Sequence, residues 1–132
     1  MKIKHRNISN STSGITLLSA DTPESRTKTY IRTIQSLLIS NTYNAGSTVS
    51  VYVQSVNKGR SDKQLIFGVS ENDNYLRYDS AFYIINNLTI PKETAVDLFG
   101  GFSKGFSYSS DYDLVIVLGD ATHSVSTILT YE

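Results

Sequence analysis

The alternation of residue types along short segments constrains the fold of this chain most. Residues 48–55 (TVSVYVQS) place three valines on one face and Ser50, Tyr52 and Gln54 on the other. A two-residue alternation is the period of a strand that buries one face and exposes the other. This segment therefore predicts a half-buried β-strand that presents Tyr52 and Gln54 outwards.

The rest of the chain repeats this arrangement of short strands and polar turns. Pro91 ends the apolar run AFYIINNLTI, because proline lacks the N–H group that a sheet ladder uses. We expect strands near residues 15–19, 30–40, 48–55, 64–70, 81–90, 94–99, 112–118 and 123–131. About eight short strands separated by turn residues predict an all-β fold, a single β-sandwich of jelly-roll or immunoglobulin-like type.

The length of 132 residues allows one domain. Residues 1–14 begin with Lys2, Lys4 and Arg6 and continue as a polar run, without the apolar stretch of a secretion signal. We expect residues 1–14 to form an extended polar arm and residues 15–132 to form the sandwich. No apolar run reaches the roughly 18 residues that a membrane-spanning helix needs, so no membrane partner is expected.

The formal net charge of zero hides an uneven distribution. Residues 1–66 carry nine lysines and arginines against three acids, a sum of plus six, and residues 67–132 carry three against nine, a sum of minus six. The neutral total lacks the basic surplus of a general nucleic-acid binder, so no nucleic-acid partner is expected. If the halves lie on different faces, copies can pack basic face to acidic face. The alternative is that the halves interleave and their charges mix.

Few side chains point to catalysis or to a cofactor. The absence of cysteine excludes disulfides and thiolate zinc sites. His123 lies near Asp120 and Ser124, but 19 serines make such proximity uninformative and no G-x-S-x-G motif accompanies it. Asp111 and Asp113 share one face of an expected strand, where a calcium ion could bridge them, although D-x-D is a weak signal. We expect no enzyme activity, no metal and no cofactor.

Several stretches in a fixed order resemble one protein family. They are SRTKTYIRTIQ followed by TVSVYVQ, then FYIINNLTIPKETAVDLF, and finally YDLVIVLGDATHSVSTIL. This order, over roughly residues 15–130, resembles small virion structural proteins of tailed bacteriophages, especially marine ones. The resemblance implies a β-sandwich that binds other virion proteins and has no catalytic residues. The charged segment at 56–63 and the glycine-rich bend at 100–105 depart from the family pattern, which leaves capsid, neck and tail positions open.

The sequence therefore favours a bacteriophage virion protein, a capsid decoration protein or a component of the neck or tail. It would be assembled in the host cytoplasm and act through symmetric contacts with other virion proteins, as a homo-oligomer. The alternative is a carbohydrate-binding or host-receptor-binding sandwich that uses exposed tyrosines and, with calcium, the two aspartates. The residues expected to contact partners are Lys2, Lys4, Arg6, Arg26, Lys28, Arg32, Tyr52, Gln54 and Arg60.

Overall fold

The protein is an all-β sandwich, as the sequence predicts. The computed structural model describes residues 1–9, 12–20, 31–55, 81–100, 105–110 and 112–132. These residues form nine strands in two sheets and contain no helix. In the same residues, accordingly, no helix is long and apolar enough to cross a membrane.

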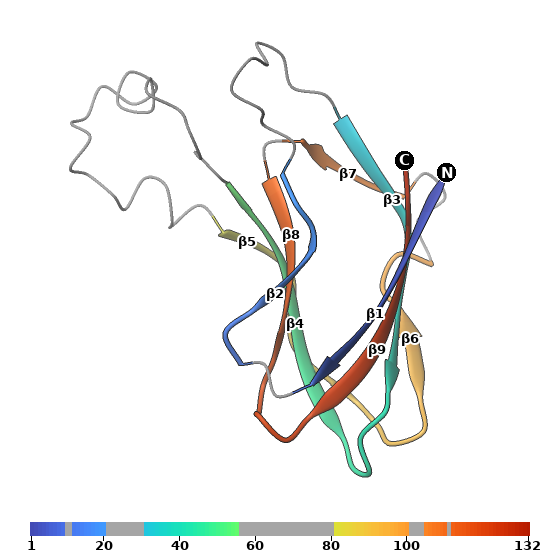
Figure 1. Cartoon of the computed structure of the whole chain (residues 1–132), viewed down its shortest axis with the longest axis vertical. Coiled ribbons are helices and arrows are strands. Elements are labelled where there is room, and N and C mark those ends of the chain that lie inside the picture. The colour runs from blue at the N-terminus through green and yellow to red at the C-terminus, as the bar shows by residue number, and fades with distance from the viewer. Residues whose placement is uncertain (10–11, 21–30, 56–80, 101–104, 111) are drawn as a thin grey trace, which may run out of the picture.

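Five of the strands make up the first sheet, which we call sheet A (Figure 1). β1 (Lys2–Ser9) lies at one edge and pairs along its whole length with β9 (Ser124–Tyr131). β9 pairs in turn with β3 (Ile31–Asn41). The far side of β3 pairs with two short strands, β6 (Ala95–Asp97) and β7 (Phe106–Ser109).

The other four strands form sheet B in the order β2, β8, β4, β5. β2 (Ile15–Leu18) and β5 (Ala81–Ile90) are its edges, and β8 (Tyr112–Leu118) and β4 (Ser47–Ser55) lie between them. Every pairing in both sheets is antiparallel. Antiparallel sheets that bury one face produce the alternating sequence pattern seen here.

The core fills the space between the two sheets. The three valines of β4 are buried, which confirms the alternation predicted for residues 48–55. Large apolar side chains from both sheets complete the core, and Ile34, Leu37 and Leu114 have no exposed surface. At about 25 cal/mol for each Å² of apolar surface removed from water, this burial is the main contribution to stability.

The N-terminal segment differs from the expected arm. Residues 2–9 are extended, but they belong to sheet A, because each residue of β1 has a partner in β9. The cations Lys2, Lys4 and Arg6 are typical of a solvated chain end, which is why the sequence predicts an arm. Ile8, which points inwards from the same strand, is nevertheless buried in the core. The body of the sandwich therefore begins at residue 2 and not at residue 15.

Three turns that cross between the sheets gather at one end of the sandwich, which we call the closed end (Figure 1). They are residues 42–46, 91–94 and 119–123. Asn41 connects the first turn with the end of β5, because its amide nitrogen donates to the carbonyl oxygens of Ala45 and Ile90, both at 2.8 Å. Its backbone N–H donates to the Thr94 carbonyl oxygen of the second turn at 2.9 Å. Both chain ends lie at the opposite end (Figure 1).

Candidate functional site: a cationic pocket between β1 and β2

The inward face of β1 carries charge where the rest of the sandwich carries apolar side chains. Ile8 lies on this face and is buried. Because side chains alternate along a strand, Arg6, Lys4 and Lys2 follow on the same face, and all three are exposed. The sandwich is therefore open along the part of β1 nearest the N-terminus.

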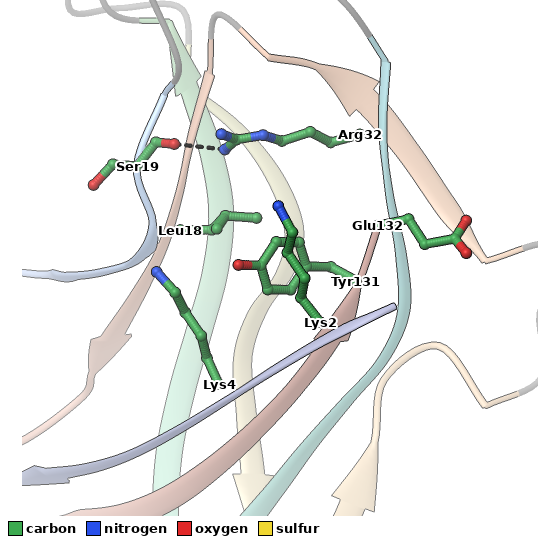
Figure 2. Close-up of a pocket in the computed structure, with 7 residues that line it drawn as sticks. All are labelled: Lys2, Lys4, Leu18, Ser19, Arg32, Tyr131 and Glu132. Carbon is green, nitrogen blue, oxygen red and sulfur yellow. Dashed lines mark hydrogen bonds between the residues drawn. The ribbon is translucent and has the colours of Figure 1, made fainter.

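Residues from β1, β2, β3 and β9 surround a pocket at this opening (Figure 2). Its volume is about 300 Å³. The residues that line it are Lys2, Lys4, Leu18, Ser19, Arg32, Tyr131 and Glu132. Three cations and one carboxylate give the lining a positive formal charge.

Arg32 is the buried cation of this pocket, with 8% of its surface exposed. Its guanidinium donates a hydrogen bond to the carbonyl oxygen of Ser19, so it connects β3 of sheet A with the residue after β2 of sheet B (Figure 2). Burial raises the pKa of the nearby Tyr108 hydroxyl, while the Arg32 guanidinium opposes that rise. Arginine is rarely buried unless it is hydrogen-bonded, and these contacts hold it in place.

A β-bulge explains why Arg32 points inwards. Ile34 pairs with Tyr131 but Ser36 pairs with Thr130, so β3 has one extra residue, Gln35, at this point. A bulge reverses the alternation of side chains. Without it, the buried face that contains Leu37 would continue through residues 35 and 33, and Arg32 would face solvent.

Lys2 and Tyr131 form the wall of the pocket nearest the chain ends. They are partners in the β1–β9 register, and Lys2 Nζ lies 5.9 Å from the centre of the Tyr131 ring. Lys2, Lys4 and the Tyr131 hydroxyl point into the pocket, whereas the carboxylate of Glu132 points away from it (Figure 2). The Glu132 backbone N–H donates to the Thr33 carbonyl oxygen at 3.0 Å, which fixes this chain end beside β3.

The arrangement suits the binding of an anion. Two lysine amines, a fixed guanidinium and a phenol hydroxyl all donate hydrogen bonds. Neither Lys2 nor Lys4 forms an ion pair with another described residue. Donors of this kind recognise a carboxylate or phosphate group.

The pocket brings together part of the set expected from the sequence. Three of the nine expected contact residues line it: Lys2, Lys4 and Arg32. Arg6 lies further along the same face of β1, and Tyr52 and Gln54 lie apart, on the outer face of sheet B. Three others lie outside the described residues: Arg26, Lys28 and Arg60. The other lining residues, which the sequence analysis did not single out, are Leu18, Ser19, Tyr131 and Glu132.

The outer face of sheet B holds an aromatic pair. The rings of Tyr52 and Tyr83 are paired across β4 and β5, with centroids 5.2 Å apart. Tyr83 is 57% exposed, whereas Tyr52 is half-buried and its hydroxyl lies close to Gly14. Burial raises the pKa of the Tyr52 hydroxyl, and Tyr83 and Asp113 raise it further. Tyr83, which the sequence analysis did not single out, is thus the more accessible ring.

The histidine and aspartates considered for chemistry have structural contacts. Nδ1 of His123 accepts a hydrogen bond from the Thr48 backbone N–H at 3.1 Å. In a catalytic triad this nitrogen would instead donate to a carboxylate. The Thr122 backbone N–H and hydroxyl both donate to Asp120, which lowers the pKa of that carboxyl.

Metal ligands do not gather in the described part of the chain. Asp113 accepts a hydrogen bond from the Ala20 backbone N–H, which connects the end of β2 with β8. Its expected companion, Asp111, lies outside the described residues. Among the residues that are described, no group of three or more His, Cys, Asp or Glu side chains could hold a metal ion.

Comparison with known proteins gives no relative. No protein-family model, no curated protein and no solved structure matches the chain.

Proposed function

We propose that the protein is a structural component of a bacteriophage virion, in its capsid, neck or tail, and that it acts by binding other virion proteins and further copies of itself. One observation carries the binding of other proteins: the exposed edge strand β1 presents three cations beside the pocket. An edge strand offers unpaired main-chain groups to a partner. The virion setting is supported by the resemblance of residues 15–130 to phage structural proteins.

Mass spectrometry of purified virions of the phage that encodes this chain tests the setting. We expect the protein at a copy number that fits the symmetry of one layer of the particle, because virion proteins repeat by symmetry. Light scattering of the isolated protein at low salt should give a multiple of 14.6 kDa. Absence from the particle would contradict the virion role, and a monomer at every concentration would contradict the homo-oligomer.

The Tyr52–Tyr83 pair favours one other function, carbohydrate binding. An exposed tyrosine offers a flat apolar face and a hydroxyl, both of which suit a sugar ring. Asn86 and Asn87 lie in the same part of β5, where Ser50 donates to the Oδ1 atom of each at 3.2 and 3.5 Å. These amides add polar groups beside the rings.

Binding of the unmodified protein and of its Tyr83→Ala variant to a glycan array tests this second function. If glycans stack on Tyr83, binding should fall about tenfold, the effect of losing roughly 1.4 kcal/mol of contact. Phe82→Ala is the matched control, because Phe82 is also 57% exposed but its ring packs towards Tyr112. Two results would count against carbohydrate binding. One is that the unmodified protein binds no glycan on the array, and the other is that Phe82→Ala lowers glycan binding as much as Tyr83→Ala does.

A further inference from the structure

The described surface concentrates its positive charge at β1 and disperses its negative charge. Four of the five described lysines and arginines lie at the β1 opening: Lys2, Lys4, Arg6 and Arg32. The described acids are spread over strands and turns: Glu93, Asp97, Asp113, Asp120 and Glu132. Asp97 accepts hydrogen bonds from the backbone N–H groups of Leu37 and Phe99, so its carboxylate stabilises the local backbone of sheet A. The described acids thus form no face that complements β1.

β1 is also the free edge of sheet A. It pairs with β9 on one side, and no described strand pairs with it on the other. Seven of its eight residues are exposed. A strand of this length can accept another extended chain through main-chain hydrogen bonds.

The charge on β1 selects which chain can pair with it. Two β1 strands from two copies, paired antiparallel, would bring lysines and arginines together on their inward faces, and like charges across a sheet destabilise the pair. An acidic strand would bring carboxylates to the same positions. Cations on the inward face therefore act against self-pairing and in favour of an acidic partner.

The two faces of β1 specify the sequence pattern of that partner. Inward side chains of an added strand would lie beside Lys2, Lys4 and the pocket. Outward side chains would lie beside Ile3, which is 67% exposed, and beside His5, whose partner on β9 is the exposed Ile128. Alternation of acidic and β-branched or apolar residues meets both requirements.

We propose that β1 accepts an extended segment of another protein as a sixth strand of sheet A, with acidic side chains that alternate along the segment and place a carboxylate in the Lys2, Lys4 and Arg32 pocket. The inference rests on the proposed function in that its partner is a protein. It adds the part of the molecule that binds and the chemistry of the partner.

A peptide of alternating glutamate and threonine, with blocked ends and about nine residues to match β1, is the probe. Fluorescence anisotropy at low salt should detect its binding to the full chain, and replacement of every glutamate by glutamine should abolish it. The double substitution Lys2→Gln and Lys4→Gln should weaken binding at least about tenfold, from the loss of two charge contacts. Lys92→Gln, an exposed lysine in a turn at the closed end, is the matched control and should leave binding unchanged.

Hydrogen exchange followed by NMR separates strand addition from simple anion binding. The glutamate peptide should protect backbone amides of β1, because an added strand hydrogen-bonds them, and glutarate at the same carboxylate concentration should not. Equal binding of the glutamine peptide, equal weakening by Lys92→Gln, or binding without protection of β1 would overturn the inference. These measurements use the isolated protein, so their outcome is independent of the virion test. The peptide can fail to bind although the protein is present in virions, and it can bind although the protein is absent from them.

Discussion

Replacement of Asn41 by aspartate is expected to lower the free energy of unfolding by about 3–5 kcal/mol, because it places an acceptor where the structure needs a donor. The Asn41 amide nitrogen donates to two carbonyl oxygens, those of Ala45 and Ile90. Its Oδ1 accepts from the Tyr43 backbone N–H at 2.8 Å and from the Ser47 hydroxyl at 3.0 Å. The side chain is buried, so water cannot replace these partners.

The substitution keeps the shape of the side chain and changes only its hydrogen bonding. In Asn41→Asp, a carboxylate oxygen would face the carbonyl oxygens of Ala45 and Ile90, and both contacts would become repulsive. Protonation restores one donor, so the loss of stability should be smaller at acidic pH than at neutral pH. Urea denaturation at both pH values measures the difference.

Asn44→Asp is the matched control for this prediction. Asn44 lies in the same turn but is exposed, so its substitution should change the free energy of unfolding by less than about 0.5 kcal/mol. Equal stability of the two variants at neutral pH would show that the Asn41 hydrogen bonds do not hold the closed end together.

Much of the fold follows from the sequence because strand periodicity is a local property. β4, β5 and β8 were predictable within a residue or so, since alternation marks β4, a proline ends β5, and β8 is a run that is apolar on both faces. β1 was not, because its cations are typical of a solvated end and its partner β9 lies at the other end of the chain. β7 has only four residues and follows a glycine-rich sequence, so it is too short to show a period.

The candidate site was predictable only in its composition. Lys2, Lys4 and Arg32 were expected to contact partners because they are cations in the basic half of the chain. Their meeting in one pocket depends on the β1–β9 register and on the bulge at Gln35 that turns Arg32 inwards. A bulge reverses the side-chain faces with a single extra residue, and nothing in the local sequence of β3 marks its position. Strands of the basic half and strands of the acidic half alternate in both sheets, so the two halves do not lie on different faces, and the strand order agrees with the interleaved alternative.

Replacement of Gly105 by alanine is the second change with a large expected effect, about 2–4 kcal/mol of lost stability. Gly105 precedes β7 with φ of +75°, a conformation that costs other residues of order 1 kcal/mol. A Cβ atom there would lie 2.5 Å from the Ile34 carbonyl oxygen, which is backbone and cannot move without disturbing β3. The neighbouring Phe106 stacks on the buried Phe99 with centroids 5.4 Å apart, so displacement of β7 also opens the core.

The position of the clash predicts where the damage begins. Hydrogen exchange should show faster exchange first in the β3–β7 ladder, where Ile34 pairs with Phe106, and later in the β3–β9 ladder. Gly46→Ala is the control: Gly46 has no positive φ, and its Cβ would meet Thr89 at an ordinary 3.5 Å. That variant should match the parent protein or gain a few tenths of a kcal/mol, because alanine restricts the unfolded chain. If the Gly105→Ala variant has the same melting temperature as the Gly46→Ala control, β7 does not pack on β3 as described.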